Sequence, residues 1–420
     1  MEKFIIEGGE KLEGEIEISG SKNSALPVIA ATILGKGKSV IRNVPDVKDV
    51  HTLLNILKYI GAKVKWQNNT VEVEPDGIDK YTAPYEFVST MRGSICLLGP
   101  LLARFGKARF SMPGGCVIGP RPIDLHLKGL RKLGAEIINE EGYIVGKAKK
   151  LKGNKIFLAG TFGSSVLATA NVLMASTLAK GETIIEFSAC EPEIVDLARF
   201  LKKMGAKIYG EGSHIIKVEG VKNLKGVEYT IIPDRIEAGT YLLLGYLTKS
   251  KLVIRNVISS HLFALIDKLE EAGINIEIKG GTIITKPEKK WKAVDIVTLP
   301  YPGFPTDLQA QMMSFLSLAD GMSVITEKVF PERFIHVGEL NRMGANISLD
   351  GSKAIVKGVD KLYGTKVMAS DLRASAALVL AGLVAEGRTE ISRIYHLDRG
   401  YEKFEKKLKL IGAKIKRVKE

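Results

Sequence analysis

The phrase LKYIGAKV (57–64) recurs five more times along this chain of 420 residues, and it decides the fold. Its glycine, Gly61, is followed by five others at separations of 73, 71, 68, 71 and 68 residues. In each phrase an amphipathic helix ends, the glycine takes the left-handed position that caps it, and an alternating strand begins. The even spacing therefore predicts six copies of one structural unit of about 70 residues. The other copies are LRKLGAEI (130–137), LKKMGAKI (201–208), LEEAGINI (269–276), LNRMGANI (340–347) and LKLIGAKI (408–415).

Two further features repeat with the same period. Upstream of each phrase the sequence predicts a turn and a strand, as in GKGKSVIRNV (35–44) and KSKLVIRNV (249–257). Before that strand lies a strongly apolar segment with many small residues, which indicates a helix buried on every side. The six apolar segments are ALPVIAATIL (25–34), SICLLGPLLARF (94–105), SVLATANVLMASTLA (165–179), AGTYLLLGYLT (238–248), AQMMSFLSLA (310–319) and ASAALVLAGLVA (374–385).

Six units of this length suit two domains of three units each, with α and β elements alternating. The last unit stops at KIKRVKE (414–420) without a second hairpin strand, whereas KFIIEGG (3–9) is a spare strand before the first unit. We therefore expect residues 21–229 to form an N-terminal domain. Residues 1–20 plus 230–420 are expected to form a C-terminal domain, so that the chain crosses between domains twice.

Composition excludes several classes of protein. Apolar residues make up 45% and charged residues 26%, which is ordinary for a globular protein. No apolar run reaches the roughly 18 residues of a membrane span, and the N-terminal residues do not resemble a signal peptide. Three widely spaced cysteines form no disulfide framework, so we expect a reducing, cytoplasmic location and no membrane association.

The formal net charge of +14 has two interpretations. One is an anionic partner, such as a phosphorylated substrate or nucleic acid, and the other is a lysine-rich solvated surface. The charge is spread evenly, without runs of like charge or a stripe of aromatic and basic residues. The sequence therefore favours the solvated surface and gives no sign of nucleic-acid binding.

The starts of the six buried helices carry the candidate chemistry. A buried helix directs free N–H groups and a partial positive charge at whatever lies beyond its first turn. Three such starts from each domain could converge on one cleft and bind an anion. Ser and Thr at these positions also serve as simple helix caps, whereas a cation there opposes the helix dipole and calls for an anion. The polar starts are Lys22–Asn23, Arg92, Ser164–Ser165, Asp234–Arg235–Glu237, Thr306–Asp307 and Asp371–Arg373.

A second candidate is the segment SMPGGCVIGPRPIDLHL (111–127), which contains Cys116. The flanking glycines and prolines predict an exposed loop, and a thiol near Arg121 would ionise readily. The alternative is a buried structural cysteine, which we expect for Cys96 and Cys190. Arg399 occupies the matching connection of the sixth unit, where the alternative role is an ion pair with Asp398 or Glu402. No His pair has metal-ligand spacing, so no metal site is expected.

The sequence closely resembles the UDP-N-acetylglucosamine 1-carboxyvinyltransferase family from about residue 4 to the C-terminus. That family has a two-domain inside-out α/β barrel fold with six repeats. It transfers the enolpyruvyl group of phosphoenolpyruvate to the 3-hydroxyl of UDP-N-acetylglucosamine, the first committed step of peptidoglycan synthesis, and needs no cofactor. The signature segments are GSKNSALP (20–27), MRGSI (91–95), GGCVIGPRPIDLHL (114–127), PDRIEAGT (233–240), FPTDLQAQ (304–311), ERFIHVGELNRMGA (332–345), DLRASAALVLAG (371–382) and RIYHLDRGYE (393–402).

The resemblance implies a role for each matching residue. Cys116 would be the general acid, which also adds to phosphoenolpyruvate and is alkylated by fosfomycin, and Asp307 the base at the sugar hydroxyl. Ligands of phosphoenolpyruvate would be Lys22, Arg121 and Arg399. The expected sugar-nucleotide contacts are Asn23, Arg92, Arg121, Pro122, Ile123, Asp124, Leu125, Gly163, Ser164, Ser165, Val166, Asp307 and Val329. Thr306 and Arg373 are also expected to bind substrate.

One segment departs from the family pattern. The run GTFGSSVLATA (160–170) lacks the usual lysine and has Leu167 where a glycine is common. Two other functions stay open on the sequence alone. One is the sister activity, 3-phosphoshikimate 1-carboxyvinyltransferase, whose family lacks the cysteine loop, and the other is nucleic-acid binding by a related repeat unit.

Overall fold

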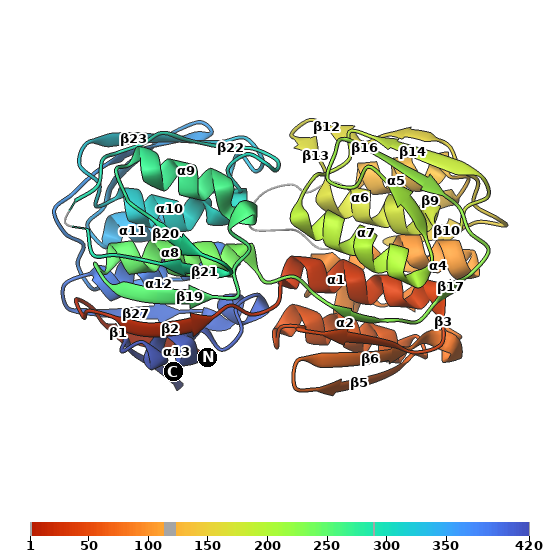
Figure 1. Cartoon of the computed structure of the whole chain (residues 1–420), viewed down its shortest axis with the longest axis horizontal. Helices are drawn as coiled ribbons and strands as arrows, with labels where there is room; N and C mark the ends of the chain where they lie inside the picture. Colours follow the sequence, from red (N-terminus) through yellow and green to blue (C-terminus); the bar gives the residue numbers. More distant parts are fainter. Residues whose placement is uncertain (1, 113–122, 289, 420) are drawn as a thin grey trace. The chain divides into compact units, whose positions relative to one another are not determined.

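A computed structural model describes residues 2–112, 123–288 and 290–419. Within these residues the chain forms two compact units, each with its own hydrophobic core. Unit 1 consists of residues 2–19 and 233–419, and unit 2 consists of residues 20–112 and 123–232. In Figure 1 each unit has helices at its centre and strands along its outer faces.

Six four-stranded sheets are present among the described residues, and all six pair their strands in the same way. In the spatial order given below, the first strand of each sheet is parallel to the second. The second strand is antiparallel to the third, and the third is antiparallel to the fourth. Unit 2 contains β18(Glu228–Thr230)-β4(Ser39–Arg42)-β6(Thr70–Glu74)-β5(Lys63–Gln67), β7(Thr82–Ala83)-β8(Lys107–Ser111)-β10(Tyr143–Lys147)-β9(Glu136–Glu140) and β11(Lys155–Phe157)-β14(Glu182–Glu186)-β16(Ile215–Glu219)-β15(Lys207–Tyr209). Unit 1 contains β2(Glu13–Glu17)-β19(Lys251–Arg255)-β21(Thr282–Ile284)-β20(Glu277–Lys279), β22(Ile296–Thr298)-β23(Met322–Glu327)-β25(Lys353–Lys357)-β24(Asn346–Asp350) and β26(Lys366–Met368)-β27(Arg388–Ser392)-β1(Glu2–Glu7)-β28(Lys414–Lys419).

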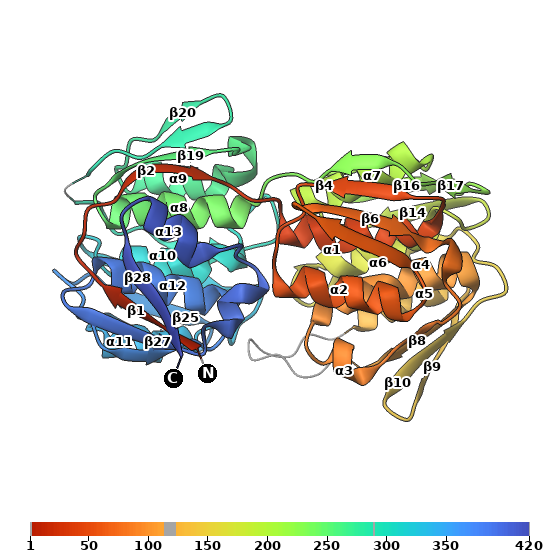
Figure 2. The same cartoon turned by 90° about the horizontal axis from the view of Figure 1, so that it is seen from below.

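The N-terminal strand β1 lies in a sheet whose other strands come from the C-terminal end of the chain. It is antiparallel to β27 on one side and to β28 on the other, with Glu2 opposite Lys419. Figure 2 shows β1 beside β28, with both chain ends nearby. In β1 the side chains of Phe4 and Ile6 are buried, so the inward face of this strand joins the core of unit 1.

The helices fall into buried and amphipathic classes, as the apolar patterns predict. Buried helices pack against one another inside each unit, α8 with α10 and α12 in unit 1 and α4 with α6 in unit 2. They are α1(Lys22–Ala31), α4(Leu98–Phe105), α6(Val166–Ser176), α8(Arg235–Leu247), α10(Gln309–Leu316) and α12(Leu372–Val384). Amphipathic helices cover the sheets: α2(Lys48–Tyr59), α5(Asp124–Lys132), α7(Pro192–Met204), α9(Phe263–Glu271), α11(His336–Arg342) and α13(Phe404–Leu410).

Shorter elements complete the connections. Two of them, η3 and η5, lead directly into the buried helices α4 and α10. The short elements are η1(Thr32–Leu34), η2(Pro75–Gly77), α3(Tyr85–Val88), η3(Arg92–Leu97), η4(Ser259–Leu262), η5(Thr306–Leu308), η6(Ile394–Arg399), and the strand pairs β12(Ala159–Gly160)-β13(Gly163–Ser164) and β3(Gly35–Lys36)-β17(Leu224–Lys225).

Glycine has two distinct uses in this architecture. All six glycines of the recurring phrase have a positive φ, from 89° at Gly273 to 112° at Gly205, so the predicted left-handed helix ends are confirmed. Gly99 instead permits close packing of buried helices. A Cβ at this position in α4 would lie 2.4 Å from the backbone oxygen of Asn171 in α6, a distance that no other residue tolerates.

Candidate active site

Three buried helices of unit 1 begin with polar residues, and two of them are capped by aspartates. Asp234 accepts hydrogen bonds from the backbone N–H groups of Ile236 and Glu237 at the start of α8. Asp371 does the same for Arg373 and Ala374 at the start of α12. These carboxylates satisfy helix N–H groups, so the expectation of polar helix starts is confirmed and their role here is capping.

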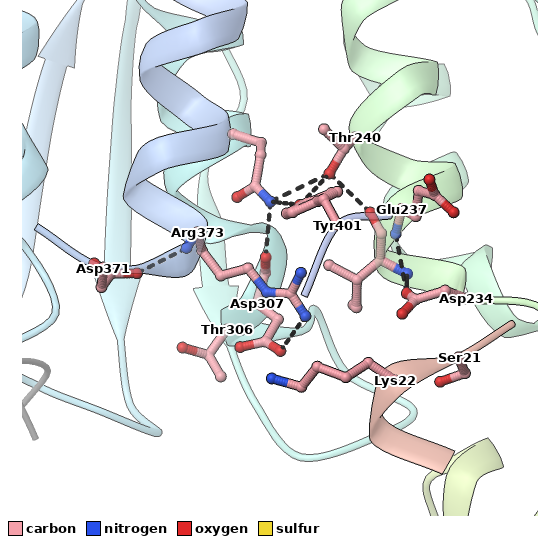
Figure 3. Close-up of polar contacts among 12 residues, drawn as sticks. Ser21, Lys22, Asp234, Glu237, Thr240, Thr306, Asp307, Asp371, Arg373 and Tyr401 are labelled. Carbon is pink, nitrogen blue, oxygen red and sulfur yellow. Dashed lines mark hydrogen bonds and ion pairs between the residues drawn. The ribbon is translucent and has the colours of Figure 1, made fainter. Parts of the chain in front are cut away.

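The start of η5 holds Asp307 between two arginines. Its Oδ1 accepts a hydrogen bond from Nη1 of Arg333 at 2.9 Å, and its Oδ2 accepts one from Nη2 of Arg373 at 3.0 Å. Figure 3 shows the Arg373 guanidinium turned toward this carboxylate. The Asp307 side chain is 29% exposed, whereas those of Arg333 and Arg373 are 6% and 2% exposed. The carboxylate is therefore partly exposed, whereas its two cations are buried.

The two arginines determine the ionisation of Asp307. Burial alone would raise the pKa of this carboxyl group, but the guanidinium groups of Arg373 and Arg333 outweigh burial and hold the pKa well below its usual range. Among the described residues, Nε and Nη1 of Arg373 have no hydrogen-bond partner although both atoms are buried. Buried guanidinium donors are costly to leave unsatisfied, so this cluster is prepared for a further acceptor.

A buried carboxylate, Glu327 at the end of β23, organises the residues around Asp307. Its Oε1 accepts hydrogen bonds from Thr298 Oγ1 at 2.6 Å and from the backbone N–H groups of Val329 and Phe330 at 2.9 Å each. Its Oε2 accepts one from Thr306 Oγ1 at 2.9 Å. Thr306 in turn accepts a hydrogen bond from Nη1 of Arg333 at 3.0 Å. Glu327 thus fixes Thr306 and Val329, two of the expected substrate contacts, in one network.

Gln311 connects this network to the neighbouring helices. Its Nε2 donates to the backbone oxygen of Asp307 at 3.0 Å and to the hydroxyl of Tyr401 at 3.1 Å. Tyr401 also shares a 2.8 Å hydrogen bond with Thr240 of α8, and the guanidinium of Arg373 lies 5.3 Å from its ring centroid. Side chains from α8, α10 and α12 therefore hold the Asp307 turn in place.

In unit 2, α1 places Lys22 at its first position, after the cap Ser21. The ammonium group donates to Oδ2 of Asp49 at 2.9 Å, and the two side chains are only 11% and 5% exposed. The sequence predicted that a cation at a helix start needs an anion, and Asp49 in the first turn of α2 supplies one that was not foreseen. Asn23 is the second residue of the same helix.

Arg92 begins η3 in unit 2, close enough to influence a buried histidine. Burial, reinforced by the charge of Arg92, lowers the pKa of His126 to about 3. The neutral ring accepts a hydrogen bond at Nδ1 from Asn171 Nδ2 at 2.9 Å. His126 lies in α5, whose first residues are Asp124 and Leu125, with Ile123 as the cap. This packing orients the part of α5 that carries three expected substrate contacts.

The variant segment 160–170 forms the β12–β13 turn and the start of α6. Ser165 caps α6 by accepting from the backbone N–H of Ala168 at 3.3 Å, whereas neither Ser164 nor Thr306 makes the capping contact that was expected of a Ser or Thr at a helix start. The hydroxyl of Ser164 is buried and has no hydrogen-bond partner in the described structure. A Cβ at Gly160 would lie 3.1 Å from Leu125 of α5. The turn and the start of α5 are thus neighbours.

Two predicted cysteine positions are confirmed, and the third is not described. Cys96 and Cys190 are free and buried, and burial raises the pKa of Cys96 to about 12 and also raises that of Cys190. Cys116, Arg121 and Pro122 lie outside the described residues, so their expected roles stay predictions. Across the described ranges no cluster of His, Cys, Asp and Glu suits a metal ion, and no helix is long and apolar enough to cross a membrane.

Sequence reasoning missed three residues that bind expected site residues, two of them in unit 1 and one in unit 2. Arg333 lies within a quoted signature segment, but no pattern distinguished it from a surface arginine. Glu327 is the last residue of the strand β23, and nothing in its local sequence distinguishes it from an exposed acidic residue. Asp49 looked like an ordinary acidic residue in the first turn of a helix. Only the folded structure brings these charges next to Asp307, Thr306 and Lys22.

Arg399 ends η6, and its neighbour Asp398 binds Arg417.

A cavity of about 440 Å³ in unit 2 lies at the other ends of the buried helices. Its lining includes Leu34, Arg104 and Leu178, which follow or end these helices. None of the expected substrate contacts lines it. The cavity is therefore separate from the helix starts that carry the candidate chemistry.

Comparison with known proteins identifies relatives along the whole chain. Residues 6–408 match the family model described as EPSP synthase (3-phosphoshikimate 1-carboxyvinyltransferase). The chain is 53% identical to UDP-N-acetylglucosamine 1-carboxyvinyltransferase from Methylacidiphilum infernorum, with 100% of this chain and 99% of that protein covered. It is also 53% identical to the enzyme of the same name from Geotalea uraniireducens, with full coverage of both. Among solved structures, the enolpyruvyl transferase NikO from Streptomyces tendae has a TM-score of 0.90 at 25% identity, with 99% of both chains covered.

Proposed function

Because the chain belongs to the EPSP synthase family of enolpyruvyl transferases, we propose that it transfers the enolpyruvyl group of phosphoenolpyruvate to UDP-N-acetylglucosamine. The observation that carries this assignment is 53% identity over the full length of enzymes with this activity. The products are the 3-enolpyruvyl ether of the sugar nucleotide and phosphate. The reaction serves cell-wall peptidoglycan synthesis, and its proposed location is the cytoplasm.

The geometry at Asp307 supports a role at the acceptor hydroxyl. Its carboxylate is ionised, partly exposed and fixed by two arginines, which suits an acceptor of a hydrogen bond from the sugar 3-hydroxyl. In the proposed reaction the hydroxyl oxygen bonds to C2 of phosphoenolpyruvate while C3 gains a proton. The tetrahedral ketal then expels phosphate and loses the proton from C3, which regenerates the double bond. Arg373, with its unsatisfied donors, stabilises negative charge beside the reacting atoms.

A depressed pKa limits Asp307 as a proton acceptor. A carboxylate that holds its charge this firmly orients the hydroxyl in the ground state and takes its proton late, as the oxygen becomes bonded to C2. Substrate groups that draw Arg373 or Arg333 away from Asp307 would raise its basicity at that moment. The two arginines therefore tune the base as well as bind the substrate.

The remaining roles follow the family resemblance. Lys22, Arg121 and Arg399 are the proposed ligands of phosphoenolpyruvate, and Cys116 is the proposed acid that protonates C3. The proposed contacts of the sugar nucleotide are Asn23, Arg92, Arg121, Pro122, Ile123, Asp124, Leu125, Ser164, Ser165, Val166, Thr306, Asp307, Val329 and Arg373.

We also propose that the two compact units are domains of three repeats each, one spanning residues 21–229 and the other residues 1–20 plus 230–420. Six sheets with the same strand order and pairing support this assignment. Six recurring phrases with a left-handed glycine support it independently. Gene duplication followed by divergence of the loops would leave this pattern.

Phosphate release from phosphoenolpyruvate tests the function directly. The purified protein is incubated with phosphoenolpyruvate and either UDP-N-acetylglucosamine or shikimate 3-phosphate. We expect release with the sugar nucleotide alone. Release with shikimate 3-phosphate instead would assign the sister activity, to which the matching family model owes its description. No release with either acceptor, together with salt-sensitive binding to generic RNA, would support the nucleic-acid alternative.

A further inference from the structure

The cavity of about 440 Å³ at the far ends of the unit 2 helices combines an apolar lining with many cations. Its volume lies in the range of sites that hold small organic molecules. None of the described residues that line it is acidic. The apolar part of the lining includes the buried leucines Leu34, Leu102, Leu151 and Leu224, and the cations are Lys36, Arg104, Lys149, Lys150 and Lys222.

One of these cations, Arg104, has a structural task. Its Nη1 donates to the backbone oxygens of Ile33 and Gly35 at 2.8 and 2.6 Å, and its Nη2 donates to Oδ1 of Asp76 at 2.8 Å. It thereby satisfies carbonyl groups at the end of η1, where the negative end of a helix dipole favours a cation. The carboxylate of Asp76 also accepts a hydrogen bond from the backbone N–H of Gly37 at 2.9 Å. Arg104 and Asp76 thus neutralise each other.

The four lysines of the cavity have no such task. Among the described residues, the ammonium groups of Lys36, Lys149, Lys150 and Lys222 make no hydrogen bond or ion pair. All four side chains are exposed. The cavity therefore gathers ammonium groups that repel one another and lacks an internal anion to balance them.

The strand bridges beside the cavity add to this repulsion. Just after the helical segments that end at Leu34 and Ser176, short parallel bridges place Lys36 opposite Lys225 and Lys180 opposite Lys152. Like charges on directly opposed residues of neighbouring strands destabilise a sheet. Unit 2 therefore retains, at two equivalent places, an arrangement that lowers its own stability.

Unit 1 builds the same bridges with charges that balance. Just after the buried helix α10, Asp320 lies opposite Lys292. Just after α12, Glu386 lies opposite Tyr363 and forms an ion pair with Nζ of Lys361 at 2.9 Å. The repeat is thus compatible with acidic residues at these places, so the cations of unit 2 are not a requirement of the fold.

A sequence match locates the change of sign in the cavity itself. The stretch GVKNLKG (220–226) of unit 2 corresponds to GVDKLYG (358–364) of unit 1, in which the bridge residues Lys225 and Tyr363 take the same place. Lys222, which lines the cavity, therefore has Asp360 as its counterpart.

We propose that this cavity is a second ligand site, which binds a small organic diphosphate with its phosphates at the lysines and its apolar body against the leucines. Several ammonium groups around one cavity match a ligand with more than one phosphate. A bare inorganic ion would leave the leucine lining without a partner, whereas an aromatic or aliphatic body covers it. None of the expected substrate contacts lines the cavity, so the inference goes beyond the proposed function.

Isothermal titration calorimetry on the full chain tests the site with three probes: ADP, geranyl diphosphate and inorganic pyrophosphate. The first two probes share the diphosphate and differ in the body, which is aromatic in one and aliphatic in the other. The variants are Lys222→Asp, which installs the unit 1 residue, and the double variant Lys150→Met/Lys222→Met. Lys290→Met is the matched control, because Lys290 of unit 1 directly precedes the buried Trp291, as Lys150 precedes the buried Leu151.

We expect at least one organic diphosphate to bind about 10-fold more tightly than pyrophosphate, because its body buries apolar surface. Its Kd should rise at least about 10-fold in Lys222→Asp and in the double variant, and stay within about twofold in Lys290→Met. Binding of none of the probes would show that the lysines are merely solvated and overturns the inference. So does equal affinity for pyrophosphate, or a Kd that the cavity variants leave unchanged.

Two further readouts separate binding from folding and from the proposed reaction. Without ligand, Lys222→Asp should melt at least as high as the wild type, because it removes a repelling cation; a fold that needs Lys222 would melt lower, which overturns the inference. Phosphate release from phosphoenolpyruvate with UDP-N-acetylglucosamine should be unchanged in both cavity variants. Its absence in the wild type would contradict the proposed function, whereas the titrations decide the cavity site independently.

Discussion

Asp307 in unit 1 and Lys22 in unit 2 sit at corresponding places, the starts of buried helical segments, but their charges are arranged in opposite ways. Asp307 is a carboxylate held between two buried guanidinium groups, and one of these, Arg373, keeps two donors without a partner among the described residues. Lys22 is an ammonium group against a nearly buried carboxylate, so that pair is balanced. Unit 1 therefore presents a site already prepared for an acceptor, whereas unit 2 presents a cation whose position is fixed by an internal anion.

The net charge of the chain is also distributed unequally, with more of it in residues 20–232 than in the rest of the chain. Residues 20–232 contain 30 Lys and Arg against 19 Asp and Glu, whereas the rest of the chain contains 31 against 28. The two arginines that bind Asp307 thus lie in the part of the chain whose charges are more nearly balanced. Net charge alone does not locate a site, because a few buried groups outweigh many solvated lysines.

The largest expected effect comes from removing the carboxylate of unit 1. Asp307→Asn should lower kcat by roughly 10²- to 10⁴-fold, because the acceptor hydroxyl loses its base. Steady-state kinetics measure the loss. Asp295→Asn is the control, since that exposed carboxylate accepts a hydrogen bond from the backbone of Val324 at 2.7 Å and lies outside the network. A kcat for Asp307→Asn within about threefold of wild type would place the base elsewhere.

Next in size is the effect of Glu327→Gln. An amide cannot accept hydrogen bonds on both of its terminal atoms, so the contact from Thr306 is lost and the Asp307 turn loosens. Unfolding in denaturant should show a loss of about 1–3 kcal/mol, and kcat should fall by roughly 10-fold. Glu339→Gln is the control, because Glu339 accepts a backbone hydrogen bond from Met368 on an exposed surface. Wild-type kcat in a destabilised Glu327→Gln protein would limit Glu327 to stability.

In unit 2, Asp49→Asn tests whether the internal anion positions Lys22. We expect the KM for phosphoenolpyruvate to rise by roughly 5- to 10-fold with little change in kcat, because a freed ammonium group samples other rotamers. Asp46→Asn removes a nearby exposed carboxylate that pairs with His51 and should leave KM unchanged. A lower KM in Asp49→Asn would show that Asp49 competes with the substrate, contrary to this account.

The ionisation of Asp307 provides a smaller but sharper test. Arg333→Met should raise the pKa of Asp307 by about 1–3 units, as loss of a neighbouring cation does, and a carbon-13 NMR titration of the carboxyl group measures the shift. In the wild type the pKa is depressed, so the stabilising contribution is present above the ordinary value of about 3.9 and is lost as the pH falls through the folded value. An unchanged pKa would show that Arg373 alone sets it.

Two buried histidines do not obscure this titration near neutral pH. Burial lowers the pKa of His126 to about 3 and that of His336 to about 4. Any acid limb of kcat/KM that Arg333→Met introduces above pH 5 is therefore not due to either ring.

The smallest effect on rate is expected for Cys96→Ala. This thiol is fully buried in the core of unit 2, so the variant should lose about 1–2 kcal/mol of stability and keep its kcat. Thermal unfolding and steady-state kinetics measure both quantities. A specific loss of rate in a well-folded Cys96→Ala protein would contradict its assignment to the core.

Much of the fold was predictable from the sequence because its signals are local. Gly61 and its five counterparts mark helix ends by backbone conformation alone, and all but the last residue of the apolar segment at 374–385 lies within the buried helix α12. The helix-start residues Asp307 and Arg373 were predictable for the same reason. Glu327, Arg333 and Asp49 were not, because their importance depends on which strands and helices pack together.

The central claim, transfer of an enolpyruvyl group to UDP-N-acetylglucosamine, is tested most directly by a mass spectrum of the sugar nucleotide after incubation with phosphoenolpyruvate and the protein. We predict that the sugar nucleotide gains one enolpyruvyl group for each phosphate released, and that Asp307→Asn forms almost none of this product. A sugar nucleotide of unchanged mass, with the wild-type protein folded and both substrates present, would contradict the account.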